Sequence, residues 1–312
     1  EPALSFSIPS IFDEISLDCR IYHPSSPPNG DQEPARNWTN TAVIIAHPYA
    51  PLGGCYDVPV LTCLCSVLLK EGVTVGTFNF RGAGGSKGRT TWTGKGELAD
   101  YESFFAFVTL YLDALELKPL TKGTKNLHIV LGGYSYGSLV VTRLPPISET
   151  LAKFSNPEEH SAAAVITTQA HALATETNNR IANERLSRPQ NHSLRIGGKA
   201  SSEMPRSSRE NRRIEPYYLL ISPLLPPISS LVMFPLGQNR ADAVWTKHPT
   251  FSIFGDNDFF TSFKKLTQWS QRLSEAANSN FQVAAVTGAG HFWVEDGVEG
   301  KLKAAVRQWV HS

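Results

Sequence analysis

The chain has 312 residues, a formal net charge of +1, 41% hydrophobic residues and 18% charged residues. This length holds one large domain or two small ones, and the composition is typical of a globular enzyme with a sizeable core. The near-neutral charge gives no reason to expect nucleic acid or an anionic membrane as the main partner. No apolar run approaches the roughly 20 residues that a membrane-spanning helix needs.

Cysteine usage bears on metal sites and on the compartment. The chain contains four cysteines, Cys19, Cys55, Cys63 and Cys65. No CxxC or Cys/His spacing predicts a zinc site, and we expect reduced thiols in a cytoplasmic protein. Two glycosylation triplets point weakly toward secretion, Asn37-Trp38-Thr39 and Asn191-His192-Ser193. Because the chain begins with Glu1, N-terminal processing or secretion stays open.

The first third of the chain alternates between strand and helix patterns. Residues 3–12 and 15–23 predict an antiparallel pair of strands. Continuous apolar runs at 42–46 and 73–80 are typical of strands that are covered on both faces. We expect Asp57 to cap a helix that ends near Lys70. A second, amphipathic helix is expected over residues 96–115, with its inward residues at Phe104, Phe105, Val108, Tyr111 and Leu112.

The same alternation continues to the end of the chain. Further strands are predicted at 127–132, 217–222, 250–255 and 281–286. Further helices are predicted after residue 137, ending near Pro145, and at 262–276 and 297–310. Strands that alternate with helices predict an α/β protein with a mostly parallel central sheet and helices on both faces. We interpret residues 1–312 as a single domain of this class.

One segment, at about 147–215, interrupts the alternation and is interpreted as an insertion. Asn156-Pro157-Glu158-Glu159 has the cap, proline and acids of a helix start, and an alanine-rich helix is expected to run on to Leu186. Residues 188–213 are polar and rich in arginine but lack the aromatic residues that stack on bases. They are therefore expected to form a flexible basic segment, not a nucleic-acid arm. The insertion either covers the active site as a lid or lies outside it.

A serine stands at a sharp turn in Gly133-Tyr134-Ser135-Tyr136-Gly137. The apolar strand 127–132 precedes this stretch, and the helix-forming Ser138-Leu139-Val140-Val141 follows it. Such a turn exposes the hydroxyl, and glycines on both sides leave it room. A serine hydroxyl becomes a nucleophile when a base removes its proton and donors stabilise the oxyanion. The sequence thus nominates Ser135 as a nucleophile.

Other reactive side chains also follow predicted strands. His47, Asp258 and His291 each come directly after or within a few residues of an apolar run. Because ligands gather at the carboxyl ends of parallel strands, these side chains are expected to meet near Ser135. A phosphate-binding turn is an alternative interpretation of the glycine-rich loop 81–88. It contains no GxGxxG frame and no helix starts directly after it, so this alternative is not favoured.

These motifs resemble those of a known superfamily. GYSYG, FGDNDFF and GAGHFW, in this order, are similar to the nucleophile, acid and base motifs of the α/β-hydrolases. HPYAPLGG and FNFRGAGGSKG further resemble small hydrolases that are loosely related to dienelactone hydrolases. The resemblance covers about residues 41–145 and 216–312. It implies the α/β-hydrolase fold, with helices on both faces of a mostly parallel sheet.

The resemblance also implies roles for individual residues. Ser135 corresponds to the nucleophile, His291 to the general base, and Asp258 to the acid that orients the base. Asp256 competes for the acid role but is expected to be a turn residue. The oxyanion hole is expected to use the backbone N–H of Tyr136. Pro48 has no N–H, so the second donor is expected to be the N–H of Tyr49, with that of Ala50 as the alternative. His47 is expected to be structural, and Arg81 to brace the loop that carries His47.

The leading hypothesis is a serine hydrolase that cleaves a carboxylic ester or thioester of a small molecule through an acyl-enzyme. A peptidase, an acyltransferase or a lyase uses the same three residues, and a binding protein on the hydrolase fold is a further alternative. No metal and no organic cofactor is implied. Substrate identity and oligomeric state are left open by the sequence.

Overall fold

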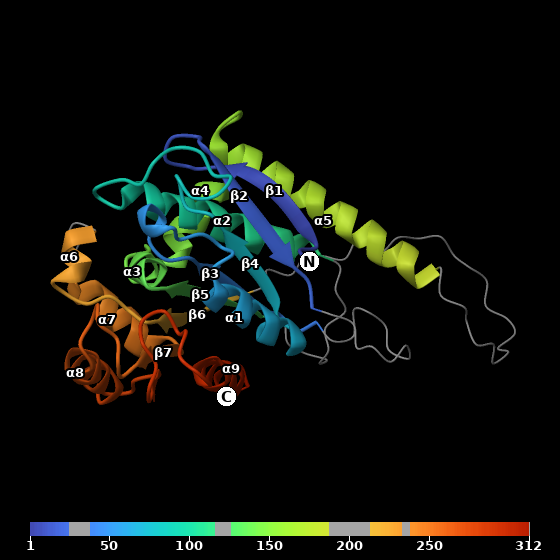
Figure 1. Ribbon diagram of the computed structural model, residues 1–312. Helices are drawn as coiled ribbons and strands as arrows, with labels where there is room; N and C mark the ends of the chain where they lie inside the picture. The colour runs from blue at the N-terminus through green and yellow to red at the C-terminus, as the bar shows by residue number, and fades with distance from the viewer. Residues whose placement is uncertain (25–37, 116–125, 187–212, 233–237, 312) are drawn as a thin grey trace, which may run out of the picture.

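The computed structural model describes residues 1–24, 38–115, 126–186, 213–232 and 238–311 (Figure 1). Eight strands form one sheet in the order β1-β2-β4-β3-β5-β6-β7-β8. The strands are β1 (Leu4–Pro9), β2 (Ser16–Tyr22), β3 (Thr41–Ala46), β4 (Thr74–Phe78), β5 (Leu127–Tyr134), β6 (Ile214–Ile221), β7 (Thr250–Gly255) and β8 (Phe281–Val286). β1 and β2 are antiparallel to their neighbours, whereas β4, β3, β5, β6, β7 and β8 run parallel. The expectation of a mostly parallel α/β sheet is confirmed.

Helices cover both faces of the sheet (Figure 1). They are α1 (Pro59–Lys70), α2 (Lys95–Ala114), α3 (Tyr136–Val141), α4 (Ile147–Ser155), α5 (Ala162–Leu186), α6 (Ile228–Val232), α7 (Gln238–Lys247), α8 (Phe263–Ser274) and α9 (Val298–Val310). Val43 and Ile45 of β3 belong to the core that contains α1 and α9. Ile44, between them, belongs to the core that contains α2, α3 and α5. Burial of both faces explains the unbroken apolar run of this strand.

Helix α2 differs from its prediction in the extent of its burial. The five inward residues expected of it are all buried, but so are polar residues elsewhere on the helix, among them Asp100, Ser103 and Thr109. The reason is that α5 covers another side of α2: the two helices pack on each other, and Ile166, Ala170 and Ala174 of α5, each 0% exposed, belong to the same core as α2. A helix that is enclosed on most sides needs no amphipathic pattern.

The described part of the insertion therefore contributes to the core. α4 and α5 pack on α2, and α5 also packs along β1 (Figure 1). The hydroxyl of Tyr111 on α2 lies 3.0 Å from the hydroxyl of Thr177 on α5 and 2.8 Å from Nε2 of His23. The predicted flexible segment 188–213 lies outside the described residues, except for Arg213.

Helix α1 begins at Pro59, two residues after the predicted cap. The side chain of Asp57 is paired with Arg20 of β2 at 2.6 Å instead, and Val58 stands at the N-cap without a side-chain hydrogen bond. Proline fits the first helical position, where its missing N–H has no intrahelical acceptor. The carboxylate of Asp57 therefore forms an ion pair with a strand that is distant in the sequence and does not cap the helix.

Helix α5 begins at Ala162, so the predicted start at Asn156-Pro157 is wrong. Asn156 instead ends α4, with φ −148° and ψ 68°. Proline at the next position disfavours the helical conformation in the residue before it. The hydroxyl of Ser161 accepts the N–H of Ala164 at 3.2 Å and supplies the true cap.

The strand order identifies the edge of the sheet at which a ligand is expected to bind. The connection from β3 through α1 leads to β4 on one side, and the connection from β4 through α2 leads back to β5 on the other. β3 and β5 are therefore neighbours whose following connections leave in opposite directions. Ligands of open α/β sheets bind in the crevice outside the carboxyl ends of such strands.

Candidate active site

The backbone turns sharply at Ser135, between β5 and α3. Ser135 has φ 55° and ψ −115°, a strained conformation for a residue with a side chain. A Cβ on Gly133 would lie 2.2 Å from the carbonyl carbon of Gly137, and one on Gly137 would lie 2.3 Å from the oxygen of Ala46. Both positions therefore require glycine. The turn has the strand, serine and helix that the sequence predicts.

Three of the predicted site residues form a hydrogen-bonded chain. His291 Nε2 lies 2.8 Å from Ser135 Oγ, and His291 Nδ1 lies 2.7 Å from Asp258 Oδ2. Ser135, His291 and Asp258 are 7%, 2% and 6% exposed. A carboxylate accepts hydrogen bonds, so Nδ1 carries a proton and, in the neutral ring, Nε2 is free to accept the proton of the serine hydroxyl. This arrangement can move a proton from Ser135 to His291.

Asp258 is held in place by the backbone that follows it. Its second oxygen, Oδ1, accepts the N–H groups of Phe260 at 2.8 Å and Thr261 at 3.1 Å. The carboxylate therefore cannot turn without breaking two further hydrogen bonds. This fixes the oxygen that faces the imidazole.

Asp256 contacts a different part of the same region. Its Oδ1 accepts the N–H of Gly288 at 2.8 Å, and Gly288 has a φ of 84° that favours glycine. The N–H of Asn257 donates to the carbonyl of Ala289 at 3.0 Å. Asp256 thus joins the loop after β7 to the loop after β8, and only Asp258 of the two aspartates is seen to contact His291.

Two aromatic side chains hold the histidine loop, and sequence reasoning missed both. The hydroxyl of Tyr134 donates to the carbonyl of His291 at 2.8 Å. The indole N–H of Trp293 donates to the hydroxyl of Ser222 at 3.0 Å, just after β6. Tyr134 and His291 are 157 residues apart. No local pattern signals a contact at that distance.

The loop after β3 is held by His47, which is fully buried. Its Nδ1–H donates to the carbonyl of Pro48 at 2.6 Å, and its Nε2 accepts the N–H of Phe80 at 2.9 Å. Burial lowers the pKa of His47 to about 4, against a smaller opposing effect of the Pro48 carbonyl, so the ring is neutral near pH 7. The rings of Tyr49 and Tyr136 lie 5.0 Å apart, which brings this loop beside the turn that carries the serine.

Arg81 does not brace the loop of His47, contrary to expectation. Its buried side chain donates two hydrogen bonds to Asp100 of α2, at 2.7 and 2.9 Å, and one to Asp13, at 3.0 Å, in the turn after β1. Asn79 is the residue of this motif that reaches toward the loop after β3, because its Oδ1 accepts the N–H of Tyr56 at 2.9 Å. Sequence reasoning missed this asparagine.

Other features of the described residues bear on metals and membranes. They contain no group of three or more His, Cys, Asp or Glu side chains arranged for a metal ion. No helix in the described ranges is both long and apolar enough to cross a membrane.

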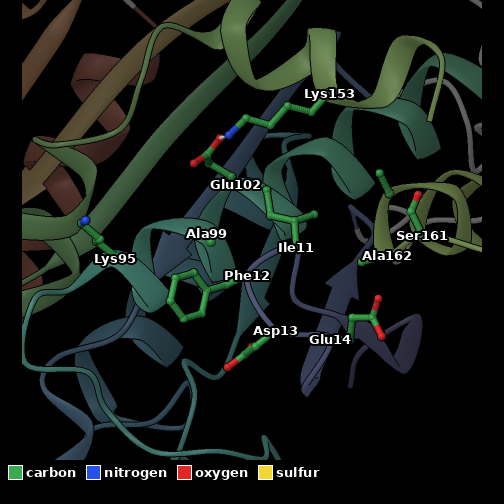
Figure 2. Close-up of a pocket in the computed structure, with 11 residues that line it drawn as sticks. Ile11, Phe12, Asp13, Glu14, Lys95, Ala99, Glu102, Lys153, Ser161 and Ala162 are labelled. Atoms are coloured by element: carbon green, nitrogen blue, oxygen red, sulfur yellow. Dashed lines mark hydrogen bonds and ion pairs between the residues drawn. The ribbon is translucent and has the colours of Figure 1, made fainter. Parts of the chain in front are cut away.

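A hollow of about 780 Å³ lies between the turn after β1, α2, α4 and the start of α5 (Figure 2). Glu102 and Lys153 point toward each other in it at 2.5 Å, and Thr150 also donates to Glu102 at 2.9 Å. Ile11 and Phe12 supply apolar surface. Its buried carboxylate is thus already paired. Ser135 and its two partners are not among the residues that line it.

Comparison with known proteins places the fold. No family model and no curated protein sequence matches the chain. Among solved structures, an α/β serine hydrolase homologue from Coxiella burnetii is 16% identical with a TM-score of 0.56, and the match covers 99% of this chain and 97% of that one. An α/β serine hydrolase without a lid from Xanthomonas campestris is 17% identical over 99% and 96% of the two chains, with a TM-score of 0.53. An esterase of Pyrococcus furiosus is 16% identical over 99% and 89%, with a TM-score of 0.55. The chain therefore has the α/β-hydrolase fold, as the resemblance of its motifs implied.

Proposed function

We propose that the protein is a serine hydrolase that cleaves a carboxylic ester or thioester of a small molecule. The observation that carries this proposal is the hydrogen-bonded chain from Asp258 through His291 to Ser135, with distances of 2.7 and 2.8 Å. A nucleophile and a base within hydrogen-bond reach, with the base oriented by a third group, are the parts that acyl transfer requires. The fold shared with esterases and serine hydrolases supports the same conclusion.

The reaction proceeds through an acyl-enzyme. Ser135 Oγ attacks the carbonyl carbon of the ester while its proton moves to His291 Nε2, and Asp258 stabilises the resulting imidazolium. The tetrahedral intermediate then breaks its bond to the leaving oxygen, which takes the proton from Nε2 and departs as an alcohol or thiol. Water repeats the sequence on the acyl-enzyme, releases the acid and restores Ser135.

Two backbone N–H groups are proposed to stabilise the oxyanion, those of Tyr136 and Tyr49. Tyr136 is the first residue of α3, where an N–H has no intrahelical acceptor. Tyr49 follows Pro48, whose carbonyl is held by His47 at 2.6 Å. Because a trans peptide is planar, holding this carbonyl also fixes the direction of the Tyr49 N–H. His47 is thus proposed to position the second donor without taking part in proton transfer.

The proposal includes a cytoplasmic location. The four cysteines are all free thiols, and Cys19, Cys63 and Cys65 are buried. Small secreted proteins in oxidising compartments often pair their cysteines in disulfides, so free thiols favour the cytoplasm. No further cofactor enters the mechanism, since each step uses only side chains, backbone N–H groups and water.

A fluorophosphonate probe tests the proposal, because it phosphonylates an activated serine and spares an ordinary hydroxyl. We expect labelling of the parent protein and none of Ser135→Ala. Hydrolysis of p-nitrophenyl esters of graded chain length should then fall by about 10⁴-fold in kcat in Ser135→Ala and in His291→Ala. An unlabelled, folded parent protein would favour a binding protein on the hydrolase fold. Labelling without ester hydrolysis would favour peptidase, acyltransferase or lyase chemistry.

A further inference from the structure

Three phenylalanine rings surround the imidazole of His291, and we call them the aromatic rim. Phe260 meets the imidazole edge-on with ring centres 4.5 Å apart, and the ring centres of Phe292 and Phe259 lie 5.6 and 6.2 Å from it. Phe259 also lies 4.4 Å from Phe260 and 5.7 Å from Phe292. The three rings thus form one continuous cluster beside the proposed base.

Packing of the core does not account for this cluster. Phe259 is 67% exposed and Phe292 is 54% exposed. Their neighbours along the chain, Asp258, His291 and Trp293, are all buried. These two loops therefore bury a carboxylate, an imidazole and an indole but leave two phenylalanine rings in water. Single exposed apolar residues are common, whereas adjoining ones beside a reactive group indicate a binding surface.

The chemistry of the proposed reaction decides which part of a substrate reaches this surface. His291 Nε2 must hand its proton to the leaving oxygen, so the alcohol part of the ester has to lie next to the imidazole. The acyl carbon is bonded to Ser135 at that stage and its oxygen faces the oxyanion donors.

We propose that the aromatic rim binds the alcohol part of the substrate and that the substrates are esters of alcohols that carry an aromatic ring. This inference rests on the proposed function. In the acylation step the bond between the acyl carbon and the alcohol oxygen breaks, the bond to Ser135 Oγ forms, and the proton of Ser135 leaves with the alcohol. An aromatic ring on that alcohol gains offset or edge-on contacts with Phe259 and Phe292.

Two isomeric esters test the placement of the ring. Phenethyl acetate carries the aromatic ring on the alcohol side, and ethyl phenylacetate carries it on the acyl side. Ethyl acetate serves as the reference without a ring. We expect Phe259→Ala and Phe292→Ala each to lower kcat/KM for phenethyl acetate by about 3- to 10-fold, mainly through KM. The other two esters should change by less than about twofold.

Phe12→Ala is the matched control, because Phe12 is 51% exposed and lies in the turn after β1, over Arg81. It should leave all three esters unchanged. An equal loss on all three esters in the rim variants, with unchanged thermal melts, would assign the rim a structural role and overturn the proposal. A loss confined to ethyl phenylacetate would place the acyl part on the rim and overturn it as well.

A binding measurement separates this inference from the proposed function. Phenethyl alcohol is titrated into Ser135→Ala, with ligand-observed NMR as the readout, and ethanol is the control ligand. We expect binding of phenethyl alcohol that is lost when Phe259→Ala and Phe292→Ala are added. If the fluorophosphonate fails to label the parent protein, the proposed function falls, but this titration still reports on the rim. No binding of phenethyl alcohol would overturn the rim proposal by itself.

Discussion

Replacing His47 by glutamine is expected to make the fold less sensitive to acid. His47 is fully buried, and burial lowers its pKa to about 4, whereas an unfolded histidine titrates near 6.5. Between these two values the unfolded chain binds more protons than the folded one, so the free energy of unfolding falls as the pH falls. From pH 7 to pH 5 the loss due to one such histidine is about 2 kcal/mol. Protonation would also remove the acceptor of the Phe80 N–H.

The assay is urea unfolding at pH 7 and at pH 5, and the quantity compared is the difference between the two free energies. This difference cancels any destabilisation by His47→Gln at neutral pH. The parent should lose about 2 kcal/mol more than His47→Gln on acidification. His171→Gln is the control, because this histidine is exposed on α5 and should behave like the parent. Burial also lowers the pKa of His23, to about 3, and this contribution remains in all three proteins. Equal losses in the parent and in His47→Gln would refute the reasoning.

Three further predictions follow from the site geometry. Asp258→Asn should lower kcat/KM on p-nitrophenyl acetate by about 10²-fold or more, whereas Asp256→Asn keeps its acceptor oxygen and should stay within several-fold; the opposite ranking would reverse the two assignments. Tyr134→Phe removes the hydroxyl that holds the histidine loop, so kcat should fall by about tenfold with little change in KM; steady-state kinetics that match the parent would contradict this role. Gly137→Ala places a Cβ 2.3 Å from a backbone oxygen and should destabilise the fold by about 3 kcal/mol or more, whereas Gly300→Ala on α9 meets nothing within 4 Å and should be neutral or stabilising; similar thermal melts for the two variants would be inconsistent with this packing.

The three residues that meet at the site were predictable because each one is marked locally. Ser135, Asp258 and His291 all follow a short apolar strand, and the rule that parallel strands share a carboxyl edge brings them together. The glycines around Ser135 add a turn signal that needs no knowledge of distant residues. Local patterns were therefore sufficient for these positions.

Contacts between distant segments were beyond this kind of reasoning. Asp57 looks like a helix cap until Arg20 is known to lie 2.6 Å away. The sequence places Arg81 beside the loop that carries His47, but its carboxylate partners are Asp100 and Asp13. Charged side chains form ion pairs with groups that are close in space, whereas the sequence gives only the distance along the chain.

The cover of α2 by α5 escaped prediction for the same reason. A helix with buried residues on most sides resembles an amphipathic helix when only its strongest apolar stripe is counted. The small residues Ala170 and Ala174 gave no sign that they adjoin α2. Packing between two helices depends on both of their surfaces, and neither surface identifies its partner.

The distance along the chain between Ser135 and His291 determines how much time separates the synthesis of these two residues. The two residues are 156 positions apart, and β6, β7 and β8 all lie between them. At translation speeds of about 5 to 20 residues per second, the serine emerges roughly 8 to 30 s before the histidine. Until β6 has been synthesised through Ile221, β5 has no neighbour on one side, and its unpaired edge is open to pairing with other chains. Appearance of turnover in a translation reaction would therefore mark the docking of the last two strands. Slow codons between residues 135 and 221 would lengthen the time for which the edge of β5 stays unpaired.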